Sequence, residues 1–195
     1  MADYTINTAS NPYHGRSRKG AATPTIVYFQ ESTCASSLVI KLGDIVSQDT
    51  TVSTGGFRIR QAYRAGGNGA NLLAIGQHIV GIAAEASTSD GSGTNLSSEG
   101  SGLVQNRKIG VFAADPETEF VGYLTSSGIS ASSLIGQTKA VQYDATNHVF
   151  LIDSTNSTAA LVTVTLTGIP EGTAGSTSGP MYFKFLSSNV SEAVS

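Results

Sequence analysis

Short apolar stretches separated by polar turns run along most of the chain, and none forms an amphipathic helix longer than a turn or two. They are rich in β-branched and aromatic residues, and several alternate apolar with polar positions, which is typical of strands. The expected strands are residues 25–30, 37–42, 57–64, 78–86, 108–112, 119–124, 139–143, 148–152, 161–167 and 181–186. The pattern predicts an all-β chain that folds as a single β-barrel or β-sandwich domain.

We expect the rest of the chain to be arranged around residues 78–124. This stretch contains a buried strand, a long loop of Ser, Gly, Thr and Asn at 87–102, and two further strands joined by turn residues at 115–118. The loop cannot bury enough apolar area to offset the entropy of ordering it. Long Gly/Ser-rich loops are therefore part of the predicted fold.

Two pairs of strands are close enough in sequence to form hairpins. Residues 25–30 can pair with 37–42 across a polar connection. Residues 139–143 and 148–152 are joined by Asp-Ala-Thr-Asn, a composition that favours a tight turn.

The N-terminal residues 1–22 contain little that could enter a core. We expect an extended arm there, followed by a β-domain at 23–188 and a frayed tail at 189–195. The candidate partner-contact residues of the arm are Tyr4, Tyr13, Arg16, Arg18 and Lys19. Two interpretations remain open: a tether that lies along an acidic partner surface, or a solvated terminus.

A second group of basic residues follows the alternation of the stretch at 57–64. Arg58, Arg60 and Arg64 fall on one side of the expected strand, opposite Phe57 and Ile59. They are candidates for an acid-recognising patch at a protein interface. The other interpretation is a solvated face whose charges protect the edge of a sheet.

The composition limits the classes of function that fit the chain. The chain has 195 residues, of which 39% are hydrophobic and only 13% charged, with 22 glycines and a net charge of -3. Low charge with abundant small residues is common in β-rich structural proteins, and the negative sign disfavours binding to nucleic acid. No stretch has the length of a membrane-spanning helix, and the single Cys34 cannot form a disulfide within the chain.

The residues of catalytic and metal sites are not grouped. His14, His78 and His148 are far apart, with no Cys or acid at ligand spacing. Glu117 and Glu119 are two residues apart, but neighbouring carboxylates on a strand usually face solvent. We therefore expect no catalytic residue, no cofactor and no metal.

Five segments of the chain share their order and texture with one known family. These segments are Ile79–Ala86, Ile109–Phe112, Pro116–Phe120, Leu134–Gln137 and Phe183–Leu186. Together they resemble the capsid decoration (cement) proteins of tailed bacteriophages. The resemblance implies a β-rich protein on the outer surface of the virion. It would bind the major capsid protein and itself as a dimer or trimer, with no direct contact to nucleic acid or membrane.

A second function of another class is a receptor- or glycan-binding module of a phage tail or fibre. Such a module needs exposed aromatic side chains over a groove. Tyr28, Tyr63, Tyr123 and Tyr182 could supply them.

Overall fold

The structure is a computed structural model of the whole chain. The residues that it describes are 14–16, 25–31, 40–48, 58–62, 78–85, 108–115, 118–125, 128–144, 149–158 and 162–190. In these residues there are strands and two short 3-10 helices but no α-helix, which confirms the all-β prediction.

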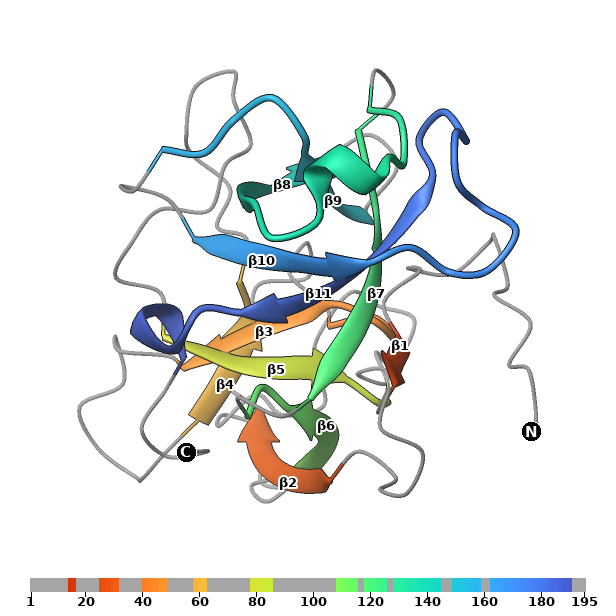
Figure 1. Cartoon of the computed structure of the whole chain (residues 1–195). Helices are drawn as coiled ribbons and strands as arrows, with labels where there is room; N and C mark the ends of the chain where they lie inside the picture. The colour runs from red at the N-terminus through yellow and green to blue at the C-terminus, as the bar shows by residue number, and fades with distance from the viewer. Residues whose placement is uncertain are drawn as a thin grey trace.

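The strands form two sheets (Figure 1). A closed barrel has the order β2-β4-β3-β5-β6, and a six-stranded sheet has the order β1-β7-β11-β10-β8-β9. The barrel strands are β2 (Ile26–Glu31), β3 (Ile45–Gln48), β4 (Arg58–Gln61), β5 (Ile79–Ala83) and β6 (Lys108–Ala113). The sheet strands are β1 (His14–Arg16), β7 (Glu119–Tyr123), β8 (Thr138–Asp144), β9 (Val149–Asp153), β10 (Thr163–Gly168) and β11 (Pro180–Phe185). The 3-10 helices are η1 (Ser132–Leu134) and η2 (Ser187–Asn189).

The barrel closes around a small interior of its own. Pairing is antiparallel except between β2 and β4, which run parallel. The interior, which we call the barrel core, consists of buried aliphatic side chains from the strands and one loop residue, with Phe29 packed against them. Its members are Ile40, Val46, Ile59, Val80, Ala83, Ile109 and Val111.

The six-stranded sheet curls until its far edge meets the chain after β7. Leu124 forms a parallel bridge with Ile152 of β9, and the Thr125 amide donates to the Ile152 carbonyl at 3.0 Å. The β7 strand therefore has β11 along one side, while its other side has β1 at its start and β9 beyond its end.

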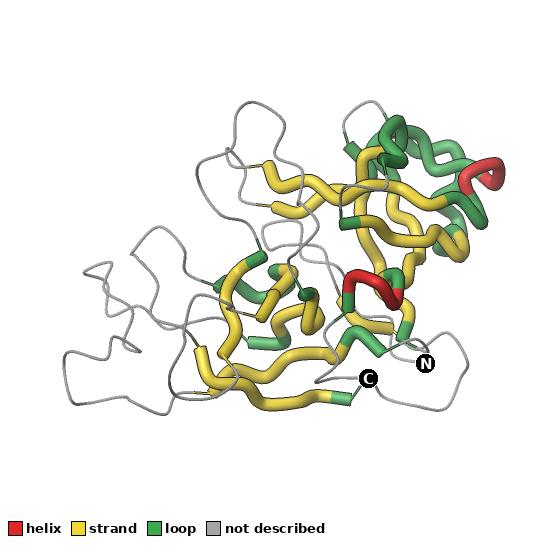
Figure 2. Tube along the Cα trace, turned by 90° about the vertical axis from the view of Figure 1, so that its left-hand side faces the viewer, coloured by secondary structure: helices red, strands yellow, loops and turns green. Residues whose placement is uncertain are grey.

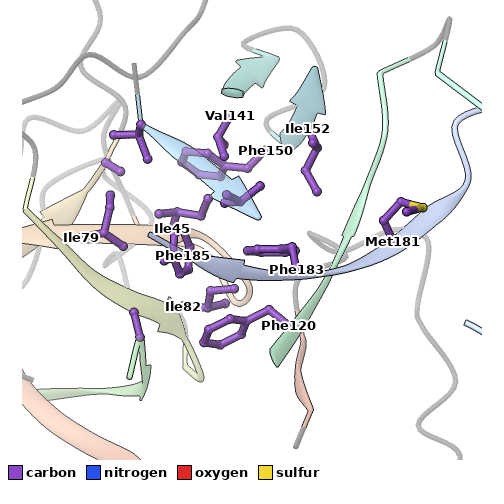
Figure 3. Close-up of a cluster of buried hydrophobic side chains, with 14 of the residues drawn as sticks. Ile45, Ile79, Ile82, Phe120, Val141, Phe150, Ile152, Met181, Phe183 and Phe185 are labelled. Atoms are coloured by element: carbon purple, nitrogen blue, oxygen red, sulfur yellow. The ribbon is translucent and has the colours of Figure 1, made fainter. Parts of the chain in front are cut away.

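The barrel and the sheet bury one hydrophobic core between them, which we call the shared core (Figure 3). Ile45, Ile79 and Ile82 enter it from barrel strands. Phe120 and Phe183 enter from the sheet as a tilted pair with ring centroids 5.7 Å apart, and Phe185 contacts both rings edge-on. Figure 2 shows the two groups of strands in adjacent halves of the molecule. Strands β3 and β5 thus contribute to both cores.

A bulge in β5 allows this strand to contribute side chains to both cores. Val46 pairs with Gly81 and Ser47 with Ile79, so β5 has one extra residue, Val80, between the two pairs. The bulge places Ile79 and Ile82 in the shared core although they are three positions apart. Gly81 is required there because a Cβ would lie 2.0 Å from the Phe112 carbonyl oxygen.

Most of the strands expected from the sequence are confirmed. β8 and β9 pair antiparallel as the hairpin predicted for 139–152. In β10, Val164 and Leu166 are fully buried while Thr165 and Thr167 are half-buried, as the alternation at 161–167 predicts.

The hairpin between 25–30 and 37–42 was predicted wrongly. β2 pairs instead with β4 and β6, which are distant in sequence. Residues 40–42 are not a strand, and 37–39 lie outside the described residues. The Asp44 carboxylate accepts the Lys41 amide at 2.8 Å and Gly43 has a φ of 84°, so the chain turns where the alternation suggested that it continues.

The stretch at 78–124 does not form one unit. β5 and β6 pair in the barrel, but β7 belongs to the other sheet. The chain passes from the barrel to the six-stranded sheet at the predicted turn at 115–118. In this turn the Thr118 amide donates to Asp115 Oδ1 at 2.8 Å, and the Thr118 hydroxyl donates to Asp115 Oδ2 at 2.6 Å. The central prediction therefore identified the strands correctly but not their partners.

The described structure extends beyond both predicted boundaries of the β-domain. The arm was expected to hold no regular structure, yet residues 14–16 form β1. The predicted tail began at Asn189, but Asn189 is buried and its amide donates to the Thr163 carbonyl at 3.2 Å. Val190 bridges to Ile79, so the packed domain extends to residue 190. Residues 191–195 lie outside the described residues.

We predict that Gly81→Ala destabilises the fold by about 2 kcal/mol or more, because the added Cβ overlaps backbone atoms of β6. Gly172→Ala is the matched control, since Gly172 also has a positive φ, of 76°, but no atom lies within 4 Å of the added Cβ. It should cost about 1 kcal/mol. Urea denaturation followed by circular dichroism measures both, and equal losses would contradict the bulge argument.

Candidate partner-contact site

The side of β7 that faces away from β11 carries the strongest candidate site. β1 pairs with it antiparallel through three residue pairs, His14 with Val121, Gly15 with Phe120 and Arg16 with Glu119 (Figure 1). We call Glu119, Phe120 and Val121 the β7 edge site. The pairing is short compared with a typical strand of about 5 residues. The main chain of the arm therefore occupies this edge through few hydrogen bonds.

Glu119 is the unusual residue of the β7 edge site. It is only 8% exposed, and within the described chain its Oε2 atom has no hydrogen-bond partner. A buried carboxylate is costly unless a positive or hydrogen-bonding group compensates it. Arg16 is the residue directly opposite, where paired Cβ atoms are about 5 Å apart.

The surroundings of Glu119 on the same side of β7 contain apolar and aromatic side chains and one lysine, because the next position of the β7–β11 register brings the half-buried Lys184 across from Glu119. Val121 and its partner Tyr182 on β11 are both buried, and neither belongs to the shared core or the barrel core. Tyr123 is half-buried, and this burial raises the pKa of its phenol above the ordinary value. Glu119 is thus a buried residue with a lysine position across from it on β11 and an arginine position across from it on β1.

The candidate basic residues are divided between the two sheets. Arg16 lies in β1, whereas Arg58 and Arg60 lie in β4, where their backbones pair with Gln30 and Ser47. β4 has a neighbour on each side in a closed barrel. The interpretation that its arginines protect a sheet edge is therefore wrong, because β4 is not an edge. The remaining candidates, Tyr4, Tyr13, Arg18, Lys19 and Arg64, lie outside the described residues.

A second surface feature lies on the barrel. Ile26 and Tyr28 are 43% and 55% exposed and fall on the same side of β2, since Phe29 packs against the barrel core. Tyr28 pairs with Gly110, whose amide donates to Glu85 Oε2 at 3.2 Å. Alternation in the sequence identifies the strand, but not which of its apolar sides remains exposed after the barrel closes.

The three described tyrosines among those proposed for a glycan-binding groove do not lie on one surface. Tyr28 is exposed on the barrel, whereas Tyr123 and Tyr182 belong to the six-stranded sheet. Tyr182 is buried. Tyr63 lies outside the described residues. The aromatic surface expected for a receptor-binding module is therefore reduced to Tyr28 in the described part of the chain.

The described part of the chain contains no candidate for two other kinds of site. Among the described residues, no three His, Cys, Asp or Glu side chains come together as a possible metal site. In the same part of the chain, no helix is long and apolar enough to cross a membrane. No family model, curated protein or solved structure matches the chain.

The raised pKa of Tyr123 gives a prediction about pH. Burial favours the neutral phenol in the folded state, so the folded protein holds this proton more tightly than the unfolded chain. The resulting contribution to stability is complete below about pH 10 and is lost as the pH rises through the folded pKa. The urea midpoint should therefore decrease less between about pH 8 and about pH 11 in Tyr123→Phe than in the wild type. An identical fall would show that Tyr123 is not the group responsible.

Proposed function

We propose that this chain is a structural virion protein, a capsid decoration or cement protein that binds the outside of a bacteriophage head. In this function it stabilises contacts between major capsid subunits and associates with further copies of itself. The observation that carries the proposal is the β1–β7 pairing, in which a short N-terminal strand docks on the edge of an otherwise compact β-domain. An arm of this kind can connect one body to the next.

The construction of the domain supports the same function. A protein that reinforces a shell must keep its shape under load, and two strand systems that share one core resist deformation because packed interiors are dense. Cohesion comes from buried aliphatic and aromatic side chains rather than from charges, so it depends little on salt.

The docked strand changes how far the arm can reach. With residues 14–16 held against β7, residues 1–13 lie on the N-terminal side of the docked strand. At about 3.3 Å per residue, they extend at most about 43 Å, enough to cross to an adjacent subunit. This segment contains Tyr4 and Tyr13, which we assign to the capsid contact.

Receptor or glycan binding in a phage tail or fibre is the second candidate. The exposed Ile26 and Tyr28 on β2 favour it, because an apolar and aromatic pair in water is a common recognition surface. The separation of the tyrosines between the barrel and the sheet counts against a sugar-binding groove.

We predict that the purified protein raises the thermal disruption temperature of capsids that lack it. A ligand that binds only the intact shell stabilises it by mass action, by about 2.7 kcal/mol per site at a concentration about 100-fold above the dissociation constant. Capsids assembled from the major capsid protein of the same genome are heated with and without the protein, and DNA release is measured. Saturating occupancy with no shift would contradict the cement function, and binding to tails or cells instead would favour the second candidate.

Two deletions distinguish the proposed contact of residues 1–13 with the capsid from the pairing of β1 with β7. Removing residues 1–13 leaves β1 in place, so the domain should remain as stable as the wild type while affinity for capsids falls. Removing residues 1–22 also uncovers the β7 edge and the buried Glu119, so we expect a lower unfolding temperature and a tendency to aggregate. Capsid cosedimentation and thermal unfolding measure the two effects. Unchanged capsid affinity after either deletion would show that the arm is a solvated terminus.

A further inference from the structure

Three side chains surround Gly110 on the outer side of the barrel, where β2 runs beside β6 (Figure 1). Tyr28 lies directly opposite Gly110, and Ile26 is two positions away on the same face of β2. Ile26 and Glu85 come close together above the glycine. A Cβ on Gly110 would lie 3.1 Å from Ile26 Cγ2 and 3.4 Å from Glu85 Oε1. We call these four residues the β2 surface site.

The main chain of β6 holds the Glu85 carboxylate in place. The Gly110 amide donates to Oε2 at 3.2 Å, which leaves Oε1 available for a second donor. Glu85 is exposed, so a group from solvent can reach it. Lys108 is also exposed on this face of β6, but among the described residues it forms no ion pair with Glu85. The site therefore offers a fixed negative charge to a partner.

The side chains of the site suit one kind of group. A carboxylate only accepts hydrogen bonds, so the group that binds it must be a donor. The face of a tyrosine ring attracts a cation, and an isoleucine offers an apolar wall to the stem of a long side chain. Arginine combines a planar fork of donors, a permanent positive charge and an apolar stem.

The spacing also fits an arginine. Cβ atoms of directly opposite residues are about 5 Å apart, so the Tyr28 Cβ and Glu85 Oε1 are separated by at most about 9 Å. The head of one arginine can fill this gap. A sugar fits less well, because its hydroxyls need donors as well as acceptors, and only Tyr28 supplies a side-chain donor among the four residues of the site.

We propose that the β2 surface site binds an arginine side chain of a partner protein. The guanidinium binds the Glu85 carboxylate and lies against the Tyr28 ring, while the stem lies along Ile26. The identity of the partner rests on the proposed function, which makes it the major capsid protein. This contact is on the barrel, whereas the arm docks on the six-stranded sheet.

A titration of the labelled full-length protein, followed by nuclear magnetic resonance, tests the site without a capsid. The probe is N-acetyl-arginine amide, and N-acetyl-citrulline amide is the matched control because its head is planar but uncharged. Arginine should shift the amide signals of Gly110 and Glu85 with a dissociation constant on the order of 10 mM, as expected for one charged hydrogen-bonding contact and one cation–π contact. Equal shifts with citrulline at the same ionic strength would overturn the proposal.

Variants assign the binding to the named side chains. Glu85→Gln keeps an oxygen that can accept the Gly110 amide and removes only the charge, so it should weaken arginine binding by about fivefold or more. Tyr28→Leu should weaken it by about threefold, whereas Tyr28→Phe keeps the ring and should bind as the wild type does. Glu171→Gln is the matched control, since Glu171 is exposed in the turn between β10 and β11. Unchanged binding in Glu85→Gln would overturn the proposal.

Two other occupants of the site give different results. If methyl α-glucoside shifts the same signals and arginine does not, the site belongs to the glycan-binding candidate and the proposal is overturned. The arm's own Arg18 and Lys19 are changed together to glutamine in the full-length chain. Arginine binding that appears only in this variant would show that the chain fills its own site, which would also overturn the proposal.

Cosedimentation with capsids of the same genome tests the identity of the partner. Glu85→Gln should lower capsid affinity by about threefold or more and make it less dependent on salt, while Glu171→Gln should match the wild type. Capsid binding that Glu85→Gln leaves unchanged would contradict this inference alone. Arginine binding by a protein that does not bind capsids would contradict the proposed function alone.

Discussion

The shared core determines how the rest of the molecule can be built, because it needs apolar side chains from two strand systems at once. The barrel is closed and already has an interior, so its strands must also present apolar residues outward to the sheet. Regular alternation in β5 would place Ile79 and Ile82 on opposite sides. The bulge resolves this conflict, and Gly81 is the residue that the bulge requires.

The sequence predicts local elements better than their partners, and the reason is physical. Alternation reports which residues are buried, so β8, β9, β10 and β11 could be found from it. It contains no information about which strand is adjacent. β2 lies between β4 and β6, because pairing within the closed barrel is more favourable than the local hairpin with 37–42 that a short loop would have allowed.

The candidate site was the least predictable part. His14, Gly15 and Arg16 have no apolar pattern, so only the unpaired edge of β7 makes them a strand. Glu119 looked like an exposed neighbour of Glu117, and the burial that gives it importance arises from the fold. Arg16 was identified as a contact residue from its charge, whereas its partner could be recognised only once β1 and β7 were in register.

A buried carboxylate at an edge has a consequence for specificity. An open strand edge offers main-chain hydrogen bonds to any extended segment, which is why exposed edges promote aggregation. Glu119 adds a condition, because a segment with an acidic residue at the position of Arg16 would place two like charges directly opposite each other. The β7 edge site therefore suits β1, which has an arginine at that position, better than an extended segment with an acid there.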